Sequence, residues 1–280
     1  MTIQDHTSEG DLYRLAGLLG LRVTCDTIPF PCVTVKDLSA PRCGTTICRT
    51  PRGLLEFCWS IEEKCFYLFA SPEIFKDPAS SIRLWRYTVI CAGVASVLRG
   101  TACMLLHGAM LRFEDRAVLL LGESGIGKST SAERWQRCGG SAPADDMLLL
   151  EAANGGFFAH AMPTWSRCLS APEHPKLSAA FALPVGGVLC LSRGGSSGER
   201  IEEIARNEFF GNILRSAFFH CRGIVKLLPE EGRRLFSSML SSLCGNLAKN
   251  HLPCALFAAL DGDLKQTMKE YFRMRGDAAV

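Results

Sequence analysis

One eight-residue segment restricts the fold of this chain more than any other feature of its sequence. Residues 122–129 read GESGIGKS and match the pattern G-x4-G-K-[ST] in full. The segment follows an apolar run, residues 117–121, and precedes a stretch of helical character, residues 129–137. A strand that leads into a glycine-rich loop and then into a helix is the context in which this pattern binds phosphate. We therefore expect an α/β fold with this loop in its core.

The residue types of the loop suit a bound nucleoside triphosphate. Glycines allow successive backbone N–H groups to converge on phosphate oxygens, and the helix N-terminus adds partial positive charge. Lys128 can reach the β- and γ-phosphates, and the hydroxyl of Ser129 can bind Mg²⁺. We expect the ATP-binding residues to form one consecutive run: Gly122, Glu123, Ser124, Gly125, Ile126, Gly127, Lys128, Ser129 and Thr130.

Two adjacent carboxylates and a histidine flank the loop in the sequence. Asp145 and Asp146 follow Lys128 by 17 and 18 residues and directly precede an apolar run, and His107 precedes Lys128 by 21 residues. A chain that leaves the loop helix and turns into a neighbouring strand can return the carboxylates to the phosphate. One carboxylate can then hold Mg²⁺, while the other accepts the proton of an attacking hydroxyl.

Taken together, His107-Gly108, the loop GESGIGKS and Asp145-Asp146 resemble the catalytic core of the HPr kinase/phosphorylase family. The resemblance implies a mixed-sheet P-loop core of the HPr kinase and phosphoenolpyruvate carboxykinase type. It also implies a kinase that uses ATP and Mg²⁺ to phosphorylate a serine-type hydroxyl of a peptide or protein. The family's Glu-x-Arg-Gly segment is not found after the aspartates, where residues 161–167 read AMPTWSR. We therefore expect an acceptor other than HPr.

The same resemblance implies roles for single residues. Asp145 would act as the base toward the acceptor hydroxyl, with His107 interacting with it. Lys128 would contact the transferred phosphate. The metal would be held by Ser129 with support from Asp146.

Three other functions are compatible with a phosphate-binding loop. The first is a kinase that acts on a small-molecule hydroxyl, and the second is a nucleotide-dependent switch or binding protein. The third is an ABC-type ATPase. Residues 191–195 (LSRGG) resemble the signature motif of that class. That class also requires an apolar run ending in Asp-Glu, whereas the chain continues GSSGERIEE. An ABC-type ATPase is therefore not expected.

The hydrophobic pattern changes near residue 100. Residues 1–100 contain short apolar segments separated by Pro and Gly, followed by a helical stretch at 82–98. This predicts a small β-rich N-terminal lobe, residues 1–100, that recognises the substrate or a partner. Residues 101–280 would form the kinase core. In the core we expect strands at 103–107, 109–113, 117–121, 147–151, 157–161, 186–191 and 254–260, and helices at 129–137, 205–219, 230–248 and 264–273.

Composition excludes several classes of protein. The net charge is only +3, which argues against a nucleic-acid partner, and the longest apolar stretch, residues 87–98, is too short to span a membrane. The first ten residues are polar and do not look like a signal peptide. The 14 cysteines contain no C-x2-C pair, so we interpret them as reduced thiols rather than zinc ligands. We expect a cytoplasmic protein whose sequence also allows a homo-oligomer.

Overall fold

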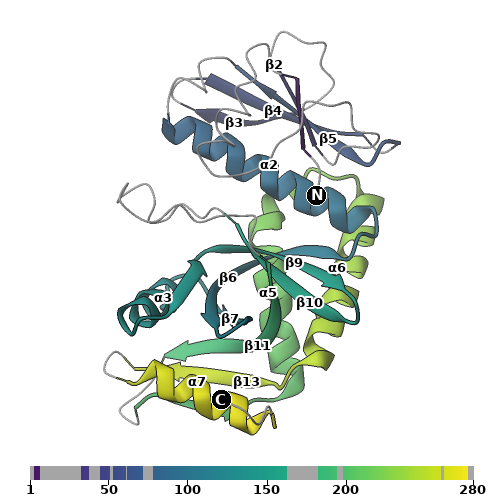
Figure 1. Ribbon diagram of the computed structural model, residues 1–280. Helices are drawn as coiled ribbons and strands as arrows, with labels where there is room; N and C mark the ends of the chain where they lie inside the picture. The colour runs from purple at the N-terminus through teal and green to yellow at the C-terminus, as the bar shows by residue number, and fades with distance from the viewer. Residues whose placement is uncertain are drawn as a thin grey trace. The chain divides into compact units, whose positions relative to one another are not determined.

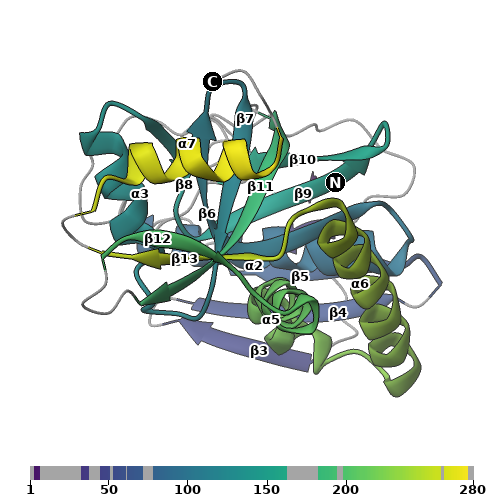
Figure 2. The ribbon, with the colours of Figure 1, turned by 90° about the horizontal axis from the view of Figure 1, so that it is seen from below.

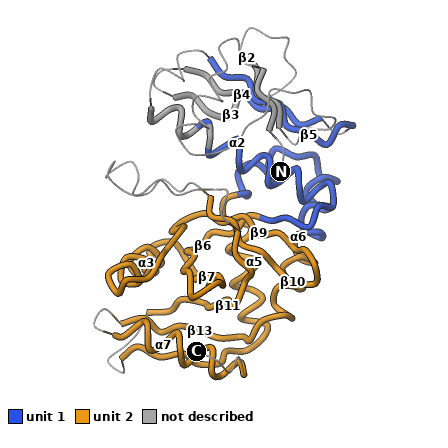
Figure 3. Tube along the Cα trace, viewed as in Figure 1, with its two compact units in different colours: residues 1–104, 167–176, 221–239 blue, residues 105–166, 177–220, 240–280 orange. Residues whose placement is uncertain are grey.

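The computed structural model describes residues 3–6, 33–37, 45–50, 53–60, 62–71, 78–162, 182–193, 198–259 and 262–276. These residues form a mixed α/β fold, as predicted (Figure 1). The chain divides into two compact units (Figure 3). One consists of residues 1–104, 167–176 and 221–239, and the other of residues 105–166, 177–220 and 240–280. The division into a recognition lobe at 1–100 and a kinase core at 101–280 stays a prediction.

The smaller unit contains a five-stranded sheet and a long helix. The strand order is β1-β2-β5-β4-β3; β1, β2 and β5 run parallel, and β4 is antiparallel to both β5 and β3. Helix α2 packs against β2 and β5. It starts at Pro78, earlier than predicted, because proline needs no N–H partner in the first turn of a helix. The elements are β1 (Ile3–His6), β2 (Val33–Asp37), β3 (Thr45–Thr50), β4 (Gly53–Ser60), β5 (Cys65–Ala70) and α2 (Pro78–Leu98).

The larger unit is built on an eight-stranded mixed sheet. Its order is β10-β9-β6-β7-β11-β13-β12, with β8 paired to β6. Strands β7, β11 and β13 run parallel, and β10 also pairs with β11, which closes a circuit of five paired strands. The strands are β6 (Cys103–Phe113), β7 (Arg116–Leu121), β8 (Ser141–Ala144), β9 (Met147–Ala153), β10 (Gly156–Ala161), β11 (Ala182–Arg193), β12 (Arg200–Glu203) and β13 (Cys254–Ala258). The helices are α3 (Lys128–Arg137), α5 (Arg206–Val225), α6 (Glu230–Asn250) and α7 (Leu264–Met274); α5 and α6 have residues in both units.

One hydrophobic core joins α3 and α7 to the sheet of the larger unit. Trp135 of α3 and Tyr271 of α7 pack in it with residues of β6, β7, β11 and β13, and Figure 2 shows α7 beside α3. Helix α7 approaches β11 so closely that a Cβ at Gly187 would lie 2.4 Å from the ring of Tyr271. The core therefore fixes the start of α3 relative to the central strands.

The structure corrects several predicted strands. Residues 103–107 and 109–113 are one continuous strand, β6, because Gly108 pairs with Leu121 of β7 instead of turning the chain. Strands β1, β3, β8 and β12 were not predicted, and β11 is longer than the predicted 186–191. The segment AMPTWSR lies largely outside the described residues.

Most of the described cysteines are buried and behave as small apolar side chains. Nine are free thiols, and burial raises the pKa of Cys190, Cys221 and Cys244 to about 12. They are therefore neutral at physiological pH. Within the described part of the chain, no helix is both long and apolar enough to cross a membrane.

Candidate functional site

The glycine-rich segment forms the turn between β7 and α3. Strand β7 ends at Leu121 and helix α3 begins at Lys128. Gly125 and Gly127 have left-handed backbone angles, with φ of 79° and 113°, and a Cβ at either would meet no atom within 4 Å. Gly127 is also the N-cap residue of α3, where no side chain makes a capping hydrogen bond. The backbone at the start of α3 thus borders open space, as a phosphate-binding turn requires.

Lys128 is the buried cation of the loop. Its side chain is folded back so that Nζ donates to the carbonyl oxygens of Gly122, at 2.9 Å, and Glu123, at 2.8 Å. The residue is 5% exposed. Burial lowers its pKa to about 8, and the negative charge of Asp146 opposes this shift. A further anion beside the ammonium group would therefore stabilise the charged form of Lys128.

The two aspartates lie in the turn between β8 and β9, beside the start of α3. The hydroxyl of Ser129 donates to the carbonyl oxygen of Asp145 at 3.4 Å. Asp146 is near enough to Lys128 for its charge to act on the ammonium group. Two segments separated in sequence by the whole of α3 and β8 are thus brought together at one end of β7.

His107, on β6, contacts the second aspartate. Its Nδ1 donates to the carbonyl oxygen of Asp146 at 3.1 Å and lies 3.2 Å from the carboxylate Oδ1. The resemblance pairs this histidine with Asp145, whereas the structure joins it to Asp146. The other ring nitrogen, Nε2, is buried and has no hydrogen-bond partner among the described residues.

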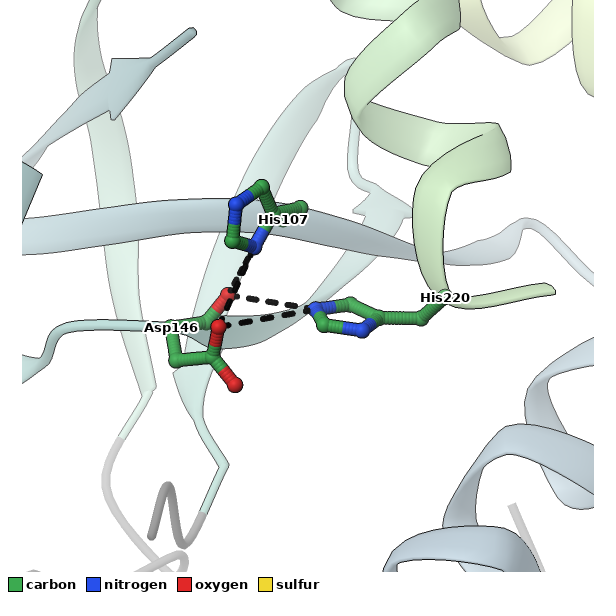
Figure 4. Close-up of side chains that lie close together, drawn as sticks. All are labelled: His107, Asp146 and His220. Carbon is green, nitrogen blue, oxygen red and sulfur yellow. Dashed lines mark hydrogen bonds and ion pairs between the residues drawn. The ribbon is translucent and has the colours of Figure 1, made fainter. Parts of the chain in front are cut away.

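Helix α5 supplies residues that the sequence analysis did not single out. The Nε2 of His220 donates to the carbonyl oxygen of Asp146 at 3.3 Å (Figure 4). The ring of Phe219 stacks on His107 with 4.1 Å between centroids, and the hydroxyl of Ser216 donates to the carbonyl oxygen of His107 at 2.9 Å. A histidine within an apolar helical stripe carries little signal in a single sequence. Only the packing of α5 on β6 shows that it belongs to this group.

A buried ion pair anchors the loop helix α3. Arg134 Nη1 lies 2.7 Å from Oε2 of Glu199, and its Nη2 donates to the carbonyl oxygen of Gly262 at 2.7 Å. The hydroxyl of Thr267, on α7, also donates to Glu199 at 3.3 Å. These bonds tie α3 to the segments that precede β12 and α7.

Comparisons with known proteins give a family match and distant structural likenesses. A protein-family model described as SynChlorMet cassette protein ScmC matches residues 72–273. One of the matching solved structures is the Hpr(Ser) kinase/phosphatase from Coxiella burnetii, with 20% sequence identity and a TM-score of 0.28. That match covers 36% of this chain and 77% of the other. A search of the curated proteins found no match.

Proposed function

The chain belongs to the SynChlorMet cassette protein ScmC family, and we propose that it is a kinase that uses ATP and Mg²⁺. In this proposal it transfers the γ-phosphate to a serine-type hydroxyl of a peptide or protein, and its larger unit is a P-loop core of the HPr kinase type. One observation carries the proposal: the turn with Asp145 and Asp146 lies beside the start of α3, where Ser129 donates to the main-chain oxygen of Asp145 and the charge of Asp146 acts on Lys128. A carboxylate pair beside a phosphate-binding loop provides the groups that phosphoryl transfer needs.

The loop accounts for binding of the triphosphate. Open space at Gly125 and Gly127, together with the uncapped N-terminus of α3, leaves room for phosphate oxygens at the positive end of the helix dipole. Lys128 would exchange its hydrogen bonds to Gly122 and Glu123 for contacts with the phosphate oxygens. A buried ammonium gains most from such an anion, because little water screens the pair.

The aspartates account for transfer to a hydroxyl. Asp145 would accept the proton of the acceptor hydroxyl as its oxygen approaches phosphorus. Ser129 and Asp146 would hold Mg²⁺, which when bound neutralises charge on the phosphates. His107 would position Asp146 through the contact of its Nδ1 with that carboxylate. The residues proposed for these roles lie at the same end of the sheet. Each of them is half-buried or buried.

The Asp145→Asn variant tests the assignment of the base. We expect phosphotransfer to fall by about 10²–10⁴-fold, because the amide cannot take up the proton, while affinity for ATP changes little. The measurement is transfer of labelled γ-phosphate to candidate peptides, with calorimetric titration of ATP in parallel. Asp115→Asn is a matched control, since the side chain of Asp115 is 95% exposed in the turn after β6. If Asp145→Asn transfers phosphate at the rate of the unchanged protein, the base lies elsewhere.

A further inference from the structure

Three side chains from three separate elements of the larger unit converge in one cluster. They are His107 of β6, Asp146 of the turn between β8 and β9, and His220 of α5 (Figure 4). One ring nitrogen of each histidine and a carboxylate oxygen of Asp146 all lie within 4.8 Å of one another. The two histidine side chains are 7% and 4% exposed, and that of Asp146 is 15% exposed. The chain thus places two imidazoles against one carboxylate in a largely dry site.

The distances between the donor atoms match those of a metal site. Oδ1 of Asp146 lies 3.2 Å from Nδ1 of His107 and 4.0 Å from Nε2 of His220. The main-chain oxygen of Asp146 lies 3.1 Å and 3.3 Å from the same two nitrogens. In a tetrahedral site with metal–ligand bonds of about 2.1 Å, the ligand atoms are roughly 3.4 Å apart. The four separations scatter around that value.

The types of donor atom indicate which ions would bind. Mg²⁺ and Ca²⁺ favour all-oxygen surroundings, whereas imidazole nitrogens favour first-row transition metals such as Mn²⁺, Co²⁺ and Zn²⁺. We propose that His107, Asp146 and His220 form a binding site for a divalent transition-metal ion, with the main-chain oxygen of Asp146 as a fourth ligand. On binding, each imidazole presents an unprotonated nitrogen to the ion, and the proton of that nitrogen moves to the other nitrogen of the ring.

Helix α5 holds the two imidazoles in position before an ion arrives. Ser216, Phe219 and His220 are spaced three and four residues apart and so lie on one face of the helix. Ser216 binds the backbone of His107, Phe219 stacks on its ring, and the ring of His220 meets it edge-on with 5.0 Å between centroids. Ligands fixed by such contacts lose little freedom on binding. The site shares His107 and Asp146 with the proposed kinase site, but it adds His220 and requires no nucleotide.

Titration with Co²⁺ in the absence of nucleotide tests the site. We expect one Co²⁺ per chain with the visible absorption of a low-symmetry nitrogen–oxygen site, and without the charge-transfer band that a thiolate ligand would add. In His220→Gln the affinity should fall about tenfold or more. His251→Gln is the matched control, because His251 is also buried in the larger unit but contacts Arg275 instead. It should bind Co²⁺ like the unchanged protein.

Several results would overturn the site. One is a folded His220→Gln protein, checked by circular dichroism, that binds Co²⁺ with unchanged affinity. Another is displacement of Co²⁺ by an equal concentration of Mg²⁺. If His220→Gln does not fold, pulsed electron paramagnetic resonance of Mn²⁺ on the unchanged protein decides: coupling to two imidazole nitrogens is expected, and its absence contradicts the site. Lys128→Ala should still bind Co²⁺. A loss of ATP binding in this variant therefore tests the proposed kinase site and not the metal site.

Discussion

Lys128 is buried by the fold and is also the residue proposed to contact the transferred phosphate. The fold buries its ammonium group, which donates to two carbonyl oxygens, those of Gly122 and Glu123. Burial lowers its pKa to about 8, so near neutral pH the group is charged but weakly compensated. In the proposed function, a bound phosphate would supply the missing negative charge. The lysine would then link nucleotide affinity to pH.

We expect the affinity for ATP to fall as pH rises above about 8. The lysine loses its proton in that range, and binding the anion then requires proton uptake. The expected loss is roughly tenfold per pH unit above the pKa of Lys128. Calorimetric titration near pH 7 and near pH 9 measures it. Lys128→Ala should bind weakly with no such slope, and an unchanged affinity across this range in the unchanged protein would contradict the role of the lysine.

At the residue scale, the sequence predicts the loop and the two aspartates but not the full set of neighbours. Gly122–Ser129, Asp145 and Asp146 have recognisable spacing, because each group lies on one short segment. His220 has no such spacing, since it reaches Asp146 only through the packing of α5 against β6.

Among the secondary-structure elements, α3 is attached by a buried ion pair in addition to its hydrophobic contacts. The side chains of Arg134 and Glu199 are 8% and 2% exposed, and Arg134 also binds the carbonyl oxygen of Gly262. A pair this deeply buried holds its partners in place mainly because each charge would be costly alone. The N-terminus of α3 carries Lys128 and Ser129. The Arg134–Glu199 ion pair therefore also helps to position the proposed site.

We expect Arg134→Met to lower the free energy of unfolding by about 3–5 kcal/mol, because Glu199 is left buried without its cation. Urea unfolding measures the change. The matched control is Arg137→Met on the same helix, whose side chain is 72% exposed and 3.9 Å from Glu133; it should stay within about 0.5 kcal/mol. Combining Arg134→Met with Glu199→Leu should recover part of the loss. Equal effects of Arg134→Met and Arg137→Met would contradict this account.

Elements with a strong local pattern were predicted, and those without one were missed. The apolar run before the loop became β7, and the amphipathic stretches became α3 and α7. Strand β8 reads SAPA and contains a proline, and β12 is short and polar, so neither has a strand pattern. Gly108 was interpreted as a break. The structure uses it for close packing, since a Cβ there would lie 2.8 Å from the side chain of Leu121.

At the scale of the whole molecule, the larger unit carries every described residue of the proposed sites. His107, the loop, the aspartates and His220 all fall within residues 105–166 and 177–220. The mixed α/β fold was predictable, because the strand–loop–helix motif indicates a strand followed directly by a helix, and further strand and helix patterns follow it in the sequence. The eight-stranded order with β10 paired to both β9 and β11 was not, because it depends on contacts between distant segments.

In the proposed reaction, the chain moves the γ-phosphate of ATP to a hydroxyl. The most direct measurement is mass spectrometry of peptides and small molecules after incubation with the protein, Mg²⁺ and ATP labelled with heavy oxygen in the γ-phosphate. We expect a labelled phosphate ester on a serine of a peptide or protein, and we expect none with Asp145→Asn. A labelled small molecule alone would identify a different acceptor class. Release of labelled phosphate to water only, or binding of ATP without any turnover, would contradict the account.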